Sequence, residues 1–445
     1  MIKIAEGSLA VKMKILKYPS AAARKRLDAI VNRHLAFKAR DVQVVKRILA
    51  DVRKNKNRAL IEYINRFDAP RLTADSLRVT KSEINAARRC VDKGFLRSLN
   101  KAAKQIEVFH RHQVEQSWFT TDLDGTMLGQ LVRPVDAAGI YVPGGRGGET
   151  PLVSSVLMGC IPAKIAGVKN ICITTPPTKN GEINAYLLAA AHRVGVDTIY
   201  KAGSAWGIAA LAYGTETVPR VDVVVGPGNI YVTLAKKMVA ATVGIDMIAG
   251  PSEILVIADQ KANPDYIAAD LLSQAEHDPL ASTMLLTTSG ELAKAVVVAV
   301  RGQLEDLPRR GIAEASLKAY GAVIVVPDLA AAFDLANRIA PEHLELLVEE
   351  PFQYLGSVQN AGAVFLGPYT PEPVGDYIAG PNHVLPTAGT ARFASALSVD
   401  HFIKKTSVVY YSEKALKRDA SDIMRLAEIE GLSGHGRAIK IRKKA

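Results

Sequence analysis

The order of apolar and polar positions divides this chain of 445 residues into a helical start and a longer α/β part. Between Asp41 and Phe67, apolar residues recur three or four positions apart, as in an amphipathic helix and not as in a strand. A second stretch with this spacing runs from Lys81 to His112. We therefore predict that residues 1–125 form a mainly helical region that packs and dimerises the protein.

From Leu131 onward, short apolar runs alternate with helical stretches, and glycine and proline separate them. Such alternation predicts parallel strands covered by helices. The expected strands are 139–142, 170–174, 198–201 and 221–225 in a first series, and 254–258, 283–287 and 323–326 in a second. The fold class is therefore α/β, with one parallel-sheet unit in residues 126–250, a related one in 251–383 and a smaller segment in 384–445.

The composition is that of a soluble globular protein, since hydrophobic residues make up 48% and charged residues 22% of the chain. No apolar run reaches the ~18 residues of a membrane span. The start, residues 1–7, lacks the basic-then-apolar order of a secretory signal. We expect a cytoplasmic protein with no membrane partner.

The formal net charge of +12 raises the question of a nucleic-acid partner. Basic residues gather at 53–58 and in the tail at 440–444, but without aromatic side chains to stack on bases and without a recognisable binding module. The charge therefore indicates a solvated surface that attracts anionic ligands, and no nucleic-acid partner is expected.

Three distant segments carry amide, carboxylate and imidazole groups together: 273–277, 341–345 and 375–377. With His435 they offer nitrogen and oxygen ligands but no thiolate, and the three cysteines lack ligand spacing. This mixture favours a hard or borderline metal beside proton-transfer residues. It predicts a metal-assisted reaction on a small polar substrate.

The helix predicted over 264–277 supports that interpretation. Asn263 is a good N-cap and Pro264 suits the first helical position. Gln274 and His277 are three residues apart, so both can reach one ion, and with Asp270 they fall on a different face from the apolar stripe.

A glycine turn in the first unit is a candidate ligand site. No GxGxxG sequence follows its first strand, but Gly-Pro-Gly-Asn at 226–229 joins a strand to a helix start. Such a turn offers backbone N–H groups and a positive helix end to an anion or amide. Tyr-Val-Pro-Gly-Gly at 141–145 ends another strand in the same way.

Seven stretches, in order and across almost the whole chain, resemble signatures of the histidinol dehydrogenases. They are Tyr-Val-Pro-Gly-Gly at 141–145, Gly-Pro-Gly-Asn at 226–229, Ala-Gly-Pro-Ser-Glu at 249–253, Gln-Ala-Glu-His at 274–277, Pro-Glu-His-Leu-Glu at 341–345, Gly-Asp-Tyr at 375–377 and Glu-Gly-Leu at 430–432 with His435. The resemblance implies two incomplete Rossmann-like domains, with smaller terminal pieces exchanged between the subunits of a homodimer. It also implies oxidation of L-histidinol through L-histidinal to L-histidine by NAD, with zinc as the metal.

The resemblance implies roles for individual residues as well. The implied catalytic residues are Glu342 and His343, and the implied zinc ligands are Gln274, His277, Asp376 and His435. The implied substrate contacts are Ser252, Gln274, His277, His343, Asp376, Glu430 and His435, and the implied NAD contacts are Tyr141 and Asn229. His343 would serve as the base for the alcohol step and Glu342 as the base that activates water.

Two positions stay open. Trp206 stands where the family usually has a glutamine, so its indole either stacks on a cofactor ring or fills a gap. His383 lies seven residues beyond Asp376 and is a weaker candidate for the pocket. The alternatives to the main hypothesis are a relative that oxidises another small amino- or sulfo-alcohol, a zinc hydrolase without a dinucleotide, and a basic nucleic-acid-binding protein.

Overall fold

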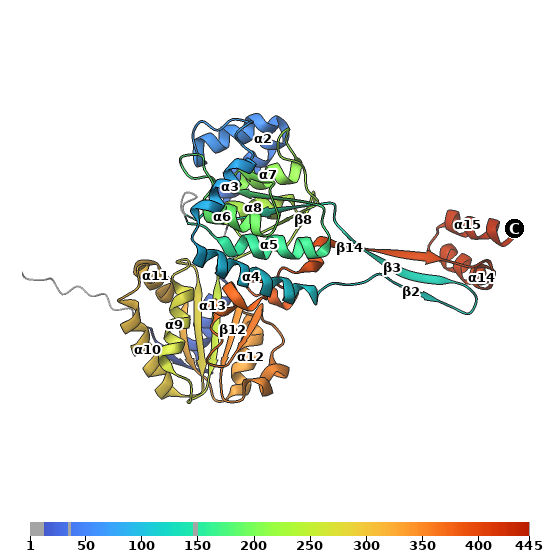
Figure 1. The fold of residues 1–445 in the computed structure, drawn as a ribbon. Helices are drawn as coiled ribbons and strands as arrows, with labels where there is room; N and C mark the ends of the chain where they lie inside the picture. The colour runs from blue at the N-terminus through green and yellow to red at the C-terminus, as the bar shows by residue number, and fades with distance from the viewer. Residues whose placement is uncertain (1–12, 34–36, 146–149, 445) are drawn as a thin grey trace, which may run out of the picture.

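The computed structural model describes residues 13–33, 37–145 and 150–444, which form two parallel sheets and a long antiparallel ribbon (Figure 1). The start at residues 1–7, which carries the expectation about a secretory signal, lies outside the described residues. Among the helices that the structure describes, none is long and apolar enough to cross a membrane.

The first sheet has five parallel strands in the order β6-β5-β4-β7-β8. Its strands are β4 (Ala137–Tyr141), β5 (Asn170–Thr175), β6 (Ile199–Lys201), β7 (Val223–Val225) and β8 (Gly244–Ile245). One face is covered by α3 (Lys81–Cys90), α4 (Lys93–Arg111), α5 (Val153–Ala166) and α6 (Ala185–Arg193), and the other by α2 (Ala39–Tyr63), α7 (Ser204–Tyr213) and α8 (Ile230–Val239). The sheet is therefore buried on both faces, as its continuous apolar strands require.

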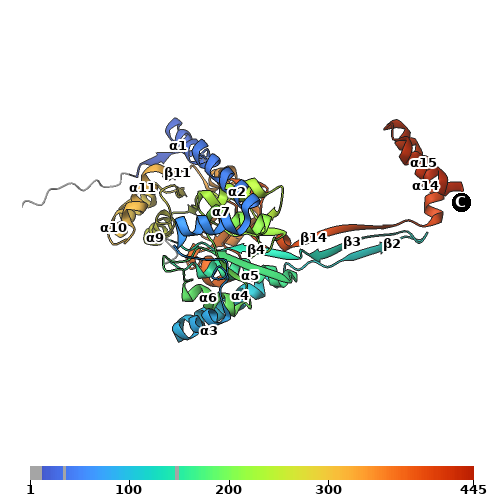
Figure 2. The ribbon, with the colours of Figure 1, turned by 90° about the horizontal axis from the view of Figure 1, so that it is seen from above.

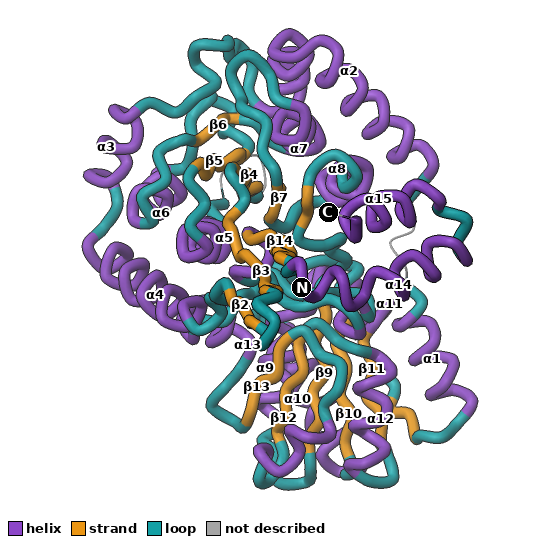
Figure 3. Tube along the Cα trace, turned by 90° about the vertical axis from the view of Figure 1, so that its right-hand side faces the viewer, coloured by secondary structure: helices purple, strands orange, loops and turns teal. Residues whose placement is uncertain are grey.

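The second sheet has six parallel strands in the order β1-β11-β10-β9-β12-β13. Its strands are β1 (Ile15–Lys17), β9 (Glu253–Ala258), β10 (Ser282–Thr287), β11 (Gly321–Val325), β12 (His343–Leu347) and β13 (Ala363–Leu366). One face carries α9 (Pro264–Ala275), α10 (Gly290–Leu304) and α11 (Arg310–Tyr320), and the other carries α1 (Ala21–Val31) and α12 (Leu329–Ile339). In Figure 3 the two sheets lie one above the other.

An arm projects from this body. It consists of the antiparallel ribbon β2 (Trp118–Thr121), β3 (Met127–Pro134) and β14 (Ile403–Tyr410), followed by α14 (Glu413–Ile429) and α15 (Ser433–Lys444). Figures 1 and 2 agree that α14 and α15 lie at the far end of the ribbon, away from both sheets. Ribbon and helices leave large apolar side chains exposed: Trp118, Phe119, Leu123, Val409, Tyr410, Leu426, Ile429 and Ile441.

The α/β class with two parallel sheets confirms the prediction, and each predicted strand is present, with ends that differ by at most two residues. Asn263 caps α9 by accepting a hydrogen bond from the N–H of Asp265, with Pro264 at the first position. The sequence patterns did not indicate the three-residue strand β1 or the ribbon β2-β3-β14. Strand β1 has only three residues, and the ribbon strands have almost no buried residues, so neither shows the apolar–polar alternation of a half-buried strand.

Candidate active site

The predicted site residues of the second unit gather at the amino-terminal edge of its sheet. His343 is the first residue of β12 and pairs with Ile254 of β9, directly after Glu253. The carboxyl-terminal end of α9, with Gln274 and His277, reaches the same edge, as does the short helix α13 (Glu372–Val374) with the π-helical turn Gly375–Ala379 that follows it. Helix α4 of the first unit contacts that turn, so this edge lies toward the first unit.

The His343 side chain is set up as a proton acceptor. Its Nδ1 lies 2.8 Å from the backbone oxygen of Glu253. A carbonyl oxygen only accepts hydrogen bonds, so Nδ1 carries the proton and Nε2 keeps its lone pair. Nε2 is buried without a hydrogen-bond partner among the described residues. Burial lowers the pKa of His343 to about 4, so the imidazole is neutral and able to accept a proton at pH 7.

Glu342 is held beside His343 by a reciprocal pair of hydrogen bonds with Glu253. Its Oε2 accepts from the N–H of Glu253 at 2.8 Å, and its own N–H donates to Oε2 of Glu253 at 3.2 Å. Burial raises the pKa of Glu342 well above its usual value, and the carboxylates of Glu253, Asp376 and Glu372 act in the same direction. Once ionised, such a group is a stronger proton acceptor than an exposed carboxylate.

Glu253 therefore orients both predicted catalytic residues, and Arg33 orients Glu253. Nη2 of Arg33 lies 2.7 Å from Oε1 of Glu253, and both side chains are almost fully buried. The N–H of Ala388 also donates to Oε1 at 3.3 Å. A buried carboxylate needs such a cation and donors to remain ionised.

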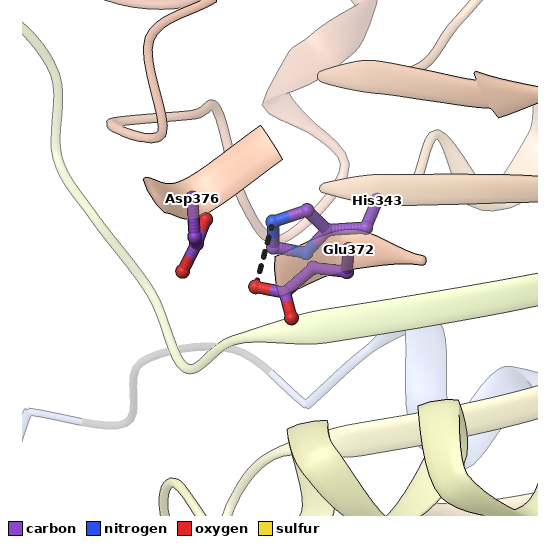
Figure 4. Close-up of side chains that lie close together, drawn as sticks. All are labelled: His343, Glu372 and Asp376. Carbon is purple, nitrogen blue, oxygen red and sulfur yellow. Dashed lines mark ion pairs between the residues drawn. The ribbon is translucent and has the colours of Figure 1, made fainter. Parts of the chain in front are cut away.

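The side chains of His343, Glu372 and Asp376 converge at the candidate site. Ligand atoms of His343, Glu372 and Asp376 all lie within 4.8 Å of one another, and Nε2 of His343 lies 3.9 Å from Oε1 of Glu372 (Figure 4). Nδ1 of His383 lies 3.9 Å from Oδ1 of Asp376. His383 and His277 both act electrostatically on His343, which places them around the same cluster. The structure therefore brings His383 to the candidate site.

The donor atoms of this cluster fit a divalent cation such as zinc. Oε1 of Gln274 is buried and has no hydrogen-bond partner among the residues described, so its lone pairs are available to an ion. Imidazole and carboxylate are ligands that zinc accepts, and the group that the described residues form contains no cysteine. The sequence pattern put Asp270, Gln274 and His277 on one polar face, whereas the structure buries the first two and exposes His277.

Glu430 and His435 do not lie with this group in a single chain. Glu430 caps α14, His435 belongs to α15, and both are exposed on the arm. Ser252, by contrast, directly precedes β9 at the site edge, where its backbone oxygen accepts a hydrogen bond from Ser282 at 3.0 Å.

The predicted cofactor residues Tyr141 and Asn229 lie at the carboxyl-terminal edge of the first sheet. The Tyr141 hydroxyl accepts a hydrogen bond from the N–H of Ser204 at 3.1 Å, and Asn229 caps α8 through its Oδ1. Gly226 has φ +116°, and a Cβ there would lie 2.1 Å from the backbone oxygen of Tyr141. Glycine is required at this position, and it brings the ends of β4 and β7 together.

Trp206 is held by other parts of the chain. Its Nε1 donates to Oδ2 of Asp68 at 2.8 Å, and the N–H of Gly203 donates to the same oxygen at 3.2 Å. Its ring stacks on Phe67 with 5.4 Å between centroids and on Tyr63 with 6.0 Å. The indole N–H is therefore already used by Asp68, and the side chain is buried.

We expect Trp206→Phe to lower the free energy of unfolding in a pH-dependent manner. Burial raises the pKa of Asp68 to about 6, and the hydrogen bond from Trp206 opposes that rise. The folded-state pKa lies above the unfolded value, so this group stabilises the fold at low pH and the stabilisation is lost as the pH rises through about 6. Without the indole donor, the loss of about 1–3 kcal/mol should be larger at pH 8 than at pH 5. The free energy of unfolding, measured in urea at both pH values for the variant and the unchanged chain, checks this prediction. Equal losses of this free energy at pH 5 and pH 8 would contradict a role for the Asp68 carboxylate.

Several residues of the cluster were not found by sequence reasoning. Glu372 stands four residues before Asp376, a helical spacing that could have indicated a shared face. Arg33 lies 220 residues from Glu253, and no local pattern connects them. Pairings at such separations emerge only from the fold.

Comparisons with known proteins point to one family. The family model described as histidinol dehydrogenase matches residues 32–443. A histidinol dehydrogenase of Desulfotalea psychrophila is 53% identical over 425 residues, covering 96% of this chain and 98% of the relative, and one of Oleidesulfovibrio alaskensis is 55% identical, covering 90% and 92%.

Among solved structures, the histidinol dehydrogenase of Elizabethkingia anophelis superposes with a TM-score of 0.90 at 40% identity, covering 97% of this chain and 98% of that one. Sequence, fold and site geometry thus lead to one conclusion: this chain belongs to the histidinol dehydrogenase family.

Proposed function

We propose that this chain oxidises L-histidinol through L-histidinal to L-histidine, using two NAD⁺ and one water. The observation that carries the proposal is the neutral His343, whose accepting Nε2 is directed to the cluster of Glu372 and Asp376, with Glu342 beside it. A proton acceptor next to a second carboxyl and a candidate cation site is what two successive oxidations of one carbon need.

In the alcohol step, His343 takes the hydroxyl proton through Nε2 while hydride leaves the carbinol carbon. The backbone oxygen of Glu253 holds the imidazole in the required tautomer and stabilises the positive charge that forms. Bound NAD⁺ supplies the hydride acceptor in both steps.

In the aldehyde step, Glu342 takes a proton from the water that attacks the carbonyl carbon. The N–H of Glu253 holds one carboxylate oxygen of Glu342, which leaves the other for water. Because only this second oxidation consumes water, the two acceptors divide the reaction between them.

We further propose that Gln274, His277 and Asp376 hold zinc together with His435 of a second copy of this chain. Bound zinc would orient the imidazole and amine of histidinol, both of which are nitrogen donors. Ser252 and Glu430 would contact the substrate, since an acidic group suits its ammonium or imidazole N–H.

The exchange of arms in a homodimer is part of this proposal. Its support is the position of Glu430 and His435 at the end of an arm with exposed apolar side chains, away from the cluster that they would complete (Figure 2). Exposed apolar residues in such number favour burial against a partner.

For the dinucleotide, we propose contacts from Tyr141 and Asn229 at the carboxyl-terminal edge of the first sheet, where ligands bind in such folds. Trp206 has a supporting role, because Asp68 already uses its N–H. A cytoplasmic location is in keeping with the three free cysteines, Cys90, Cys160 and Cys172.

The test is the yield of NADH from a known amount of L-histidinol. We expect two NADH per histidinol, whereas a zinc- and NAD-dependent dehydrogenase of another small amino- or sulfo-alcohol would give little NADH with this substrate. One NADH per histidinol would mean that the aldehyde is the product and would contradict the two-step proposal.

Removal of the metal by a chelator should abolish turnover, and added zinc should restore it. The physical reason is that the buried Oε1 of Gln274 and the carboxylate of Asp376 would then face no cation. Elemental analysis before and after dialysis, with activity measured on the same samples, checks this. Full activity in a metal-free sample would contradict the zinc site.

A further inference from the structure

Behind the candidate active site lie two buried carboxyls, Asp270 and Glu345, which form a layer with Glu372 of the site; the three are 8%, 1% and 3% exposed. Each is on the same segment as a residue of the site. Asp270 precedes Gln274 by one helical turn on α9, and Glu345 follows His343 by two residues on β12, which places both on one face of the strand. Glu372 precedes Asp376 by four residues.

Hydrogen bonds join these three segments through the carboxyl layer. Oε1 of Glu345 accepts from the backbone N–H of Glu372 at 2.9 Å. The side chain of Asp270 hydrogen-bonds to that of Glu345, and Glu372 hydrogen-bonds to Asp376. The layer therefore connects α9, β12 and residues 372–376, which are far apart in sequence and have no short connection to hold them in register.

Orphaned polar atoms mark the side of the layer that faces the site. Oε1 of Gln274, Nε2 of His343 and Oε2 of Glu345 are all buried without a hydrogen-bond partner in the described part of the chain. The first two atoms carry lone pairs that a bound cation or the substrate could use. Oε2 of Glu345, in contrast, faces the carboxyl of Asp270, and a hydrogen bond between two carboxyls requires a proton on one of them, which here is Glu345 as the donor.

This layer is costly for the fold. Within the described residues, no lysine or arginine forms an ion pair with Asp270, Glu345 or Glu372, and the nitrogen 3.9 Å from Oε1 of Glu372 is that of the neutral His343. Buried carboxyls without a cation destabilise a fold, and an apolar replacement would serve packing better. Their presence directly behind the site indicates a task in the reaction and not in packing.

We infer that Asp270 and Glu345 are positioning residues, which set α9, β12 and residues 372–376 at the separation that the metal and substrate require. This inference rests on the proposed function and adds two residues to it. Neither side chain needs to touch the substrate, because Glu345 acts through the backbone of Glu372 and Asp270 acts through Glu345. Groups in this supporting position commonly contribute about 10- to 100-fold to metal affinity or activity.

The experiment compares Glu345→Leu, Glu345→Gln and a matched control, Ser316→Ala. Ser316 is a buried residue of α11 whose hydroxyl donates to the backbone oxygen of Ala281, so its loss removes one buried hydrogen bond in which no residue of the site takes part. Zinc affinity is measured by competition with a coloured chelator. Activity is measured as kcat and KM with histidinol, and stability is measured by urea unfolding.

Glu345→Leu should bind zinc about 10- to 100-fold more weakly and lose kcat in a similar ratio. Glu345→Gln should stay close to the wild type, because its amide oxygen still accepts from Glu372 and its NH₂ group donates to Asp270. Ser316→Ala should lose stability alone. If Glu345→Leu does not fold, Asp270→Ala is judged by the same criteria.

The inference is overturned if the folded Glu345→Leu variant binds zinc and turns over like the wild type. It is equally overturned if Glu345→Gln is as impaired as Glu345→Leu, because the negative charge and not the position would then matter. Failure of the proposed function gives a different result, since the wild-type chain itself would then produce no NADH from histidinol.

Discussion

Glu342→Gln should slow the oxidation of histidinal by about 10²- to 10⁴-fold, the usual contribution of a general base, while the first hydride transfer stays comparatively intact. The amide cannot take a proton from water, but its oxygen still accepts the hydrogen bond from the N–H of Glu253, so the local geometry is kept. His343→Asn should instead slow the first transfer, because the acceptor Nε2 is removed.

Single-turnover measurements that start separately from histidinol and from histidinal separate the two steps. Glu349→Gln is a suitable control, because this carboxylate lies beyond the end of β12, is exposed and pairs with Lys261. An equal loss in both steps for Glu342→Gln would show that the residues do not divide the work, even with the overall reaction unchanged.

His435→Asn should reduce activity at least about 10- to 100-fold, since even groups that only support a ligand have effects of that size. A mixture of His435→Asn with His343→Asn should then regain activity. In an exchanged dimer, a mixed pair has one site built from the intact core of one chain and the intact arm of the other, and a second site with both defects. Random pairing in a symmetric dimer therefore predicts about a quarter of the wild-type activity.

The matched control for this mixture pairs His343→Asn with Glu342→Gln. Both changes lie in the core, so no mixed dimer contains an intact site, and turnover should not rise above that of the separate variants. Co-refolding the two chains and measuring NADH production checks both mixtures. If His435→Asn and His343→Asn together stay inactive, the arm serves its own chain and the exchange is wrong.

The predicted residues of the two sheets lie at opposite edges. Tyr141 is the last residue of β4 and Gly226 follows β7, whereas Glu253 and His343 begin β9 and β12 of the second sheet. The left-handed backbone of Ala340 ends α12, and Pro341 and Glu342 follow before the strand starts. At this irregular joint the pair does not lie on a helix, and Glu342 and His343 both turn toward Glu253.

The sequence by itself determined the α/β class, the positions of most strands and helices, and the family to which the chain belongs. It could do so because burial on two faces leaves continuous apolar runs, caps such as Asn263 are local, and short motifs carry residue identity. Only the tertiary structure decided that Arg33 supports Glu253, that Asp68 uses the indole of Trp206, that Asp270 meets Glu345, and that His435 lies on an arm away from the cluster. These contacts join segments tens to hundreds of residues apart, and periodicity reports which face of a segment is buried, not which partner buries it.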